Sequence, residues 1–208
     1  MFSISTLFLF MGAAVLLIFI PGPDLIFAIT QGITNGRKAG LYTSIGLALG
    51  NIIHTLAAAF GLSVLVKTSP ILFTLFKIAG ALYLFNLAWK SLKFRKAVLS
   101  LTPGEKIHEG SLLRKGLIMN VLNPKVAIFF LTFLPQFVNY EYGQVPLQMI
   151  LLGLIFIVLT ALIFGLCAYF AGMFSSKLLE KPHVQEGANI GAGVIFLCLG
   201  IKLLTTSP

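Results

Sequence analysis

Charged residues are scarce in this chain. Only 10% of its 208 residues are Asp, Glu, Lys or Arg, 58% are hydrophobic, and the mean hydropathy is +0.99. A soluble globular domain carries about 25% charged residues, so this composition excludes a water-soluble enzyme. The chain has room for about six transmembrane helices of some 20 residues each. No length is left over for a soluble domain.

Cysteine is almost absent. Cys167 and Cys198 both lie in apolar stretches, without a CxxC motif or metal-ligand spacing. We expect both to be packing residues; the alternative is a membrane thiol-redox carrier, which needs two cysteines that meet. No nucleophile with an activating base stands out, so we expect no enzyme. Lys and Arg are missing from the start of the chain, so we expect its first apolar segment to be retained as a helix.

Six long apolar segments remain, and none has the alternating pattern of a β-barrel strand. The sequence therefore predicts an all-α integral membrane protein with one transmembrane domain over residues 1–208. The predicted spans are about Leu7–Ile29, Leu41–Val66, Ile71–Trp89, Leu117–Val138, Leu147–Phe174 and Ala188–Leu204.

Acidic residues are also few, so the net charge is +9. The basic residues lie mainly between apolar segments, which favours a role in membrane topology over nucleic-acid binding. The odd-numbered connections hold eleven Lys and Arg, whereas the even-numbered ones hold only Lys67. We therefore expect the odd connections to be cytoplasmic and both termini to lie outside. The basic loop at about 90–116 has a lipid-headgroup or regulatory site as its alternative reading.

Proline interrupts the first and fourth spans, at Pro21-Gly22-Pro23-Asp24 and at Asn123-Pro124-Lys125. Matching breaks predict two three-helix repeats of opposite direction, over about 1–95 and 111–208, as in many secondary transporters. We expect Pro23 and Pro124 each to begin a new half-helix, with Asn123 as an N-cap. Both half-helices would present free N–H groups to an anion. The alternative is a structural kink.

A charge within the membrane costs at least about 2.5 kcal/mol, so Asp24 and Lys125 need an explanation. If the two breaks meet, these residues bring a carboxylate and an ammonium into one cavity. That pair suits an amino acid: Asp24 would bind the α-ammonium, while Lys125 and the half-helix N–H groups receive the α-carboxylate. The alternative is a direct ion pair between Asp24 and Lys125 that only holds the structure together.

Two further titratable residues lie within predicted spans. His54 follows Gly46 and Gly50 at i+4 spacing, on a narrow face that should pack against another helix. Its imidazole suits proton coupling, or it is simply hydrogen-bonded to a carbonyl. Lys77 is a second candidate for coupling or gating, with snorkelling to the interface as the alternative. We expect the asparagines of the spans to be interhelical hydrogen-bond partners and not ligands.

Several ordered motifs together are similar to the LysE/RhtB family of amino-acid exporters. They are Pro21-Gly22-Pro23-Asp24, Gly36-Arg37-Lys38-Ala39-Gly40 leading to His54, Lys77-Ile78-Ala79-Gly80-Ala81-Leu82-Tyr83-Leu84, and Gly116 through Asn123-Pro124-Lys125 to Leu134-Pro135-Gln136-Phe137-Val138. The resemblance covers nearly the whole chain. It implies site residues at the first break with Asp24, at His54 and at the second break. Many family members have Asn in place of Asp24.

The resemblance also implies a function. It is that of a bacterial inner-membrane exporter of amino acids or close derivatives, driven by proton antiport, without a cofactor and working as a homodimer. The alternative within transport is efflux of a metal ion or another small metabolite. A metal would need several convergent ligands, and the spans offer only Asp24, His54 and the two cysteines.

Overall fold

The computed structural model describes residues 2–20, 22–62, 70–95, 108–171 and 182–205, and every regular element in these ranges is a helix. The prediction of an all-α chain is confirmed. The α-helices are α1 (Ile4–Phe19), α2 (Pro23–Thr34), α3 (Arg37–Leu56), α5 (Pro70–Lys93), α6 (Glu109–Val121), α7 (Pro124–Ile128), α8 (Val145–Ala171) and α9 (Pro182–Thr205). Short π-helical and 3₁₀ segments extend α3 and α7, namely η1 (Ala57–Leu62), η2 (Phe129–Phe133) and η3 (Leu134–Phe137).

Local sequence sets several of the helix ends. The Ser3 side chain accepts a hydrogen bond from the backbone N–H of Thr6 at 3.0 Å, which caps the start of α1. Gly36 precedes α3 with a φ of 88°, in the left-handed region that glycine enters without a steric penalty. The chain therefore turns sharply between α2 and α3 at this glycine.

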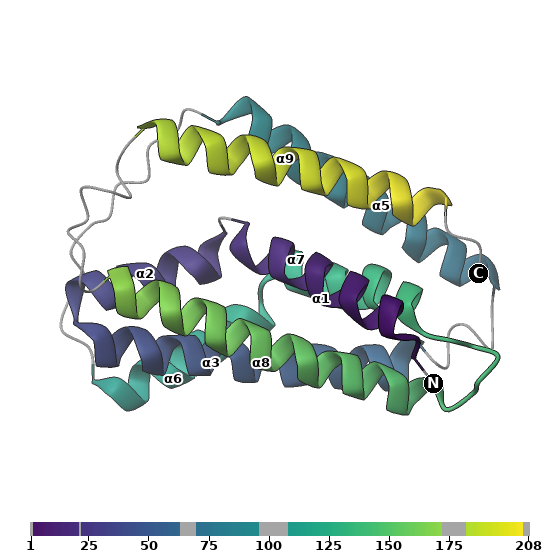
Figure 1. Ribbon diagram of the computed structural model, residues 1–208, viewed down its shortest axis with the longest axis horizontal. Helices are drawn as coiled ribbons and strands as arrows, with labels where there is room; N and C mark the ends of the chain where they lie inside the picture. Colours follow the sequence, from purple (N-terminus) through teal and green to yellow (C-terminus); the bar gives the residue numbers. More distant parts are fainter. Residues whose placement is uncertain (1, 21, 63–69, 96–107, 172–181, 206–208) are drawn as a thin grey trace.

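Helix α3 is central to the larger group of helices. It packs against α6 on one side and α8 on another, while α1 and α2 also contact α8. Helices α5 and α9 run side by side as a second group (Figure 1). Helix α6 begins at Glu109, earlier than the expected Leu117, because a hydropathy window detects apolar residues and misses the basic first turns of a helix.

Two described helical segments are long and apolar enough to cross a membrane, Arg37–Gly61 and Val145–Ala171. Two bent pairs pass the same test when each is taken as one span. The axes of α1 and α2 differ by 61°, and those of Gly110–Val121 and Pro124–Phe137 differ by 51°. Several side chains of α5 and α9 are not described, so the roles of these two helices as spans stay predictions.

Small residues let α3 approach its neighbours closely. A Cβ atom on Gly46 would collide with the backbone carbonyl of Leu113 on α6, and one on Gly50 would lie 2.6 Å from Asn120 Oδ1. The predicted helix-packing role of the Gly46, Gly50 and His54 face is therefore confirmed. This close crossing of α3 and α6 brings the Asn120 side chain into the interior of the protein.

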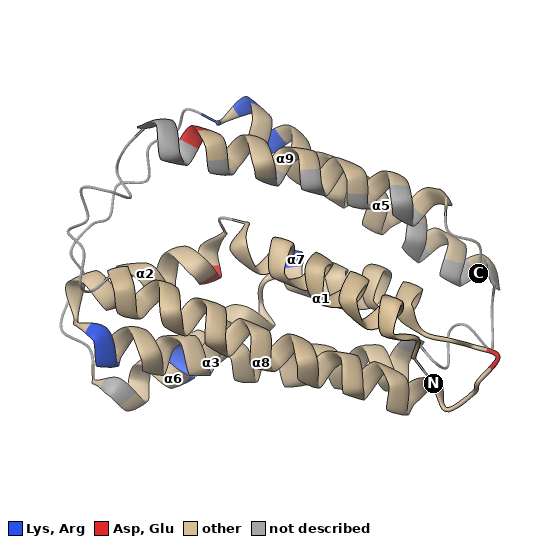
Figure 2. Ribbon diagram, viewed as in Figure 1, with Lys and Arg blue, Asp and Glu red and all other residues tan. Residues whose placement is uncertain are grey.

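The charged side chains are unevenly distributed between the two ends of the bundle. The end where α2 meets α3 carries Arg37 and Lys38, and the same end holds Arg114 and Lys115 near the start of α6 (Figure 2). Arg95 forms an ion pair of 3.2 Å with Glu186 of α9. The opposite end, where α8 begins, carries an acidic residue, and α1 begins and α9 ends on this side (Figure 2). Apart from Lys125 in the interior, these basic residues thus lie toward one end of the bundle, the distribution that the positive-inside rule describes.

Candidate functional site

The two helix breaks lie next to each other in the interior. Lys125, in the first turn of α7, donates a hydrogen bond from Nζ to the carbonyl oxygen of Ile20 at 3.0 Å. Ile20 is the C-cap of α1, where backbone carbonyls lack helical partners and the helix dipole is negative. The Lys125 ammonium therefore satisfies a carbonyl that the first break has freed. This bond joins the fourth predicted span to the first.

Glycine at the first break lies beside this lysine. Gly22 is the N-cap of α2, in an extended conformation. A Cβ atom at this position would lie 3.4 Å from Lys125 Nζ. A methyl group at residue 22 would be in ordinary van der Waals contact with the ammonium.

Asp24 follows in the first turn of α2, with only 4% of its surface exposed. Its Oδ2 accepts a hydrogen bond of 2.8 Å from the Asn120 side-chain amide on α6. Its Oδ1 is buried and has no hydrogen-bond partner. Asp24 and Lys125 form no ion pair within 4.0 Å; Arg95 and Glu186 make the one ion pair recorded in the described ranges. Opposite charges thus face one site without neutralising each other directly.

Asn123 organises the second break. Its side-chain oxygen accepts the backbone N–H of Lys125 at 3.0 Å, and its backbone carbonyl accepts the N–H groups of Val126 and Ala127. Asn123 and Pro124 therefore occupy the N-cap and first helical positions expected for them. The first N–H groups of α7 are already bonded, however. The expectation that this half-helix presents free N–H groups to a substrate is wrong.

His54 lies behind the site. Its Nε2 donates to the backbone carbonyl of Asn120 at 3.1 Å, and its ring stacks on Phe130 with centroids 5.8 Å apart. The side chain of Asn120 in turn contacts Asp24. His54 thus supports the residue that holds Asp24, and it does not line the cavity itself.

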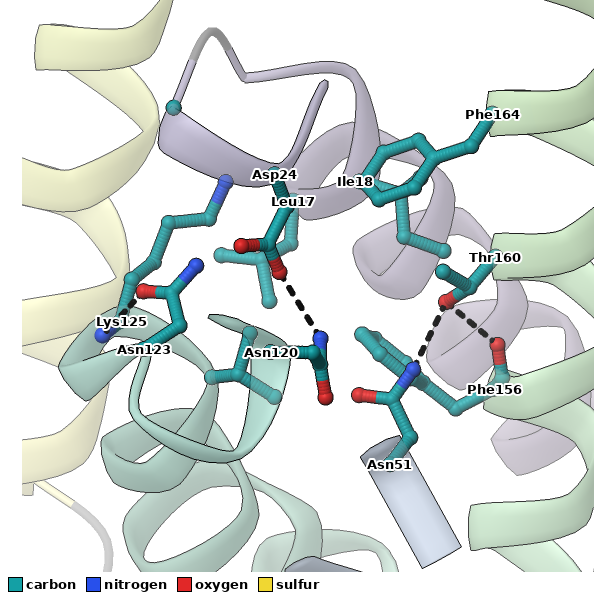
Figure 3. Close-up of a pocket in the computed structure, with 12 residues that line it drawn as sticks. Leu17, Ile18, Asp24, Asn51, Asn120, Asn123, Lys125, Phe156, Thr160 and Phe164 are labelled. Atoms are coloured by element: carbon teal, nitrogen blue, oxygen red, sulfur yellow. Dashed lines mark hydrogen bonds between the residues drawn. The ribbon is translucent and has the colours of Figure 1, made fainter. Parts of the chain in front are cut away.

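A small cavity lies between these residues (Figure 3). Its volume is about 20 Å³, which is enough for one water molecule but not for an amino acid. Figure 3 shows Asp24, Asn120, Asn123 and Lys125 on one side and Asn51 and Thr160 on the other. The apolar part of the lining comprises Leu17, Ile18, Val126, Phe156 and Phe164. The site in this structure therefore has no room for an amino acid.

Comparison with known proteins identifies the chain. A family model described as LysE type translocator matches residues 15–207. The chain belongs to the LysE-type translocator family. The matched region contains both breaks and every residue that lines the cavity. The predicted resemblance to LysE/RhtB exporters is confirmed.

Curated relatives of this translocator are membrane and efflux proteins. The uncharacterized membrane protein YrhP of Bacillus subtilis (strain 168) is 33% identical over 199 residues, covering 91% of this chain and 93% of its own. A leucine efflux protein of Klebsiella pneumoniae subsp. pneumoniae is 24% identical over 208 residues, covering 98% and 97%. A leucine efflux protein of Enterobacter sp. (strain 638) is 26% identical over 199 residues, covering 94% and 92%. No solved structure matches the chain. The family and the apolar helices together make this a multi-pass membrane protein.

The structure brings together four of the residues predicted for the translocator's site, Gly22, Asp24, Asn123 and Lys125. Pro23 and Pro124 begin their helices but are exposed and do not line the cavity. Pro21 and the side chain of Lys77 lie outside the described residues. Their predicted roles stay predictions.

Sequence reasoning missed three polar residues of the lining. Asn51, Asn120 and Thr160 are each at most 1% exposed and face the cavity. The asparagines were expected to be hydrogen-bond partners between helices, which Asn51 and Asn120 both also are. One signal was available: Asn120 precedes Asn123 by three residues, so both lie on the same helical face just before the break.

Few of the described side chains could bind a metal ion or take part in a redox reaction. No group of three or more His, Cys, Asp or Glu side chains occurs among the residues the structure describes. Cys167 is half-buried on α8, Cys198 is exposed on α9, and both are free thiols. The geometry thus offers one carboxylate, one ammonium and several amides, which suit an organic zwitterion.

Proposed function

We propose that this translocator is a secondary active exporter that moves amino acids or close derivatives out of the cytoplasm. One observation carries the proposal: a carboxylate and an ammonium line one buried cavity without forming an ion pair. Burying a charge is costly unless it is paired. A zwitterion with its ammonium near Asp24 and its carboxylate near Lys125 would compensate both charges. Leucine efflux proteins among the relatives favour this substrate class.

Alternating access would rest on two inverted three-helix repeats, with α1 and α2 as the first span and α6 and α7 as the fourth. The packing supports this arrangement. Helix α3 packs on α8 and α5 packs on α9, which pairs the second span with the fifth and the third with the sixth. Helix α6 packs on α3, just as α1 and α2 pack on α8. These pairings agree with a two-fold relation between the repeats.

Transport would begin when the repeats move apart on the cytoplasmic side. In this structure, Lys125 bonds the Ile20 carbonyl and joins the two breaks. A substrate carboxylate would take Lys125 from this carbonyl and so loosen the junction. A proton entering in exchange would reset the site, with Asp24 or His54 as the carrier and Lys77 as a further candidate for gating. The protein would work in the bacterial inner membrane as a homodimer, with both termini outside.

Release of amino acids from dipeptide-loaded cells tests the proposal. Cells that express the protein are loaded with individual dipeptides, and the amino acids released are followed over time. We expect faster release of a subset of amino acids, and loss of this acceleration in Lys125→Ala. The matched control is Lys38→Ala, which removes an exposed lysine at the end of the bundle. If no amino acid is released faster from cells with well-expressed protein, the proposal is wrong.

A further inference from the structure

Three buried oxygen atoms around the cavity have no hydrogen-bond partner in the described part of the chain. They are Asp24 Oδ1, Asn51 Oδ1 and Asn120 Oδ1, which come from α2, α3 and α6. The three side chains are 4%, 0% and 1% exposed. Buried acceptors without a partner are rare in folded proteins and call for a ligand or a water molecule. That all three line one cavity indicates a shared ligand.

The orientation of each amide is fixed by its neighbours. Asn120 must turn its NH₂ group to Asp24, because a carboxylate can only accept. The Thr160 hydroxyl donates to the Phe156 carbonyl at 2.8 Å, so it must accept from the Asn51 NH₂ group, 3.5 Å away. Both amides are therefore left with their oxygens unbonded. Figure 3 shows Asn120 and Asn51 next to each other beside the cavity.

We propose that Asp24, Asn51 and Asn120 together form the receptor for the α-ammonium group of the exported amino acid. An alkylammonium group carries three N–H donors and a positive charge. The three oxygens supply three acceptors, one of them on a carboxylate. The cavity of about 20 Å³ has the size of this group alone. The rest of the substrate would enter as the apolar lining opens.

This inference rests on the proposed function and adds Asn51 and Asn120 to the site. An inorganic cation such as sodium is also a small, positively charged ligand, and the same three oxygen atoms could surround it. A carboxylate does not, because three acceptor oxygens would repel it. The experiment below distinguishes the ammonium from the inorganic cation.

Competition with substrate analogues tests the receptor. Purified protein in liposomes exchanges labelled leucine, and two competitors are added. Leucinamide keeps the ammonium without the carboxylate, and 2-hydroxy-4-methylpentanoate keeps the carboxylate without the ammonium. We expect Asn51→Leu to weaken competition by leucinamide about tenfold, the loss typical of one hydrogen bond to a charged group. Competition by the hydroxy acid should not change.

Two variants serve as controls. Asn51→Asp keeps oxygen acceptors and should bind leucinamide at least as well as the original protein does. Ser44→Ala removes a buried hydroxyl on the same helix whose bond is to the Gly40 carbonyl, and it should change neither competition. The proposed receptor is wrong if Asn51→Leu weakens competition by leucinamide and by the hydroxy acid equally. It is also wrong if competition by leucinamide does not change.

A binding measurement separates failure of the receptor from failure of the proposed function. Thermal unfolding of the detergent-solubilised protein is followed with butylammonium chloride, sodium chloride or choline chloride. We expect stabilisation by butylammonium that is lost in Asn51→Leu, even if the protein exports no leucine. Stabilisation by sodium alone would assign the oxygens to an inorganic cation and overturn the ammonium receptor.

Discussion

Asp24 is the residue at which a single substitution best separates function from stability. Its carboxylate is buried, accepts one hydrogen bond from Asn120 and leaves its other oxygen unbonded. Such a group destabilises the fold unless a ligand compensates it. The residue is therefore better explained by function than by stability.

Replacement of Asp24 by Asn should separate these two properties. Asn has almost the same shape and removes the uncompensated charge, so we expect the free energy of unfolding to stay the same or to rise by about 1 kcal/mol. The affinity for the amino acid should fall about tenfold, because the acceptor becomes neutral. Thermal unfolding and exchange in liposomes measure the two effects. A large loss of stability with unchanged affinity would make Asp24 a structural residue.

Asp24 and Lys125 could be predicted from the sequence because a charge inside an apolar span is conspicuous. Asn51 and Asn120 could not, since an amide within a membrane helix fits an ordinary hydrogen bond between helices equally well. Only the arrangement in space distinguishes them. The side-chain oxygen of each asparagine is buried beside the cavity and has no hydrogen-bond partner. The Lys125 contact with the Ile20 carbonyl likewise depends on tertiary packing that the sequence does not contain.

Among the helices, the close crossing of α3 and α6 controls the position of Asn120. Gly50 is the critical residue, because a Cβ atom there would lie 2.6 Å from Asn120 Oδ1 and 2.7 Å from Asn120 Cβ. Helix α6 would have to move away from α3, or Asn120 would have to leave Asp24. The geometry of the site thus depends on a residue that does not line the cavity.

Gly50→Ala should therefore lower the free energy of unfolding by about 1–3 kcal/mol, the usual cost of overpacking a core. It should also weaken substrate binding, because Asn120 is displaced. The matched control is Gly12→Ala on α1, where nothing lies within 4 Å of the new Cβ atom. Because alanine favours a helix over glycine, the control should unfold at the same or a higher temperature. Equal unfolding temperatures for the two variants would show that the crossing tolerates a methyl group.

The long helices could be predicted from hydrophobic length alone, and their ends could not. Helix α6 starts at Glu109 because helical hydrogen bonding continues through Arg114 and Lys115, which a search for apolar residues rejects. The second break was predicted in more detail, since Asn123 and Pro124 have strong positional preferences at a helix start. The free N–H groups predicted at this break are absent, because the Asn123 side chain and carbonyl accept hydrogen bonds from them.

For the whole molecule, the orientation in the membrane is the property that decides the direction of transport. The basic ends of α3 and α6 lie together, and the loop after η3 lies at the opposite end (Figure 1). The positive-inside rule places the basic end in the cytoplasm. Both termini should then face outward.

Labelling of single cysteines tests this orientation. In a background with Cys167 and Cys198 replaced by Ala, we introduce Lys38→Cys or Tyr142→Cys. A thiol reagent that does not cross membranes should label intact cells that carry Tyr142→Cys and spare those with Lys38→Cys, while both react after lysis. Labelling of Lys38→Cys alone in intact cells would invert the orientation and contradict an outward-facing N-terminus.

Outward transport by the purified protein tests the central claim most directly. The protein is reconstituted into liposomes loaded with one amino acid, a pH gradient is imposed, and efflux is measured for the original chain, Lys125→Ala and Lys38→Ala. We predict efflux that depends on the gradient, is abolished by Lys125→Ala and is retained in Lys38→Ala. Absence of efflux for every amino acid, or equal efflux with and without Lys125, would contradict export through the junction of the two broken helices.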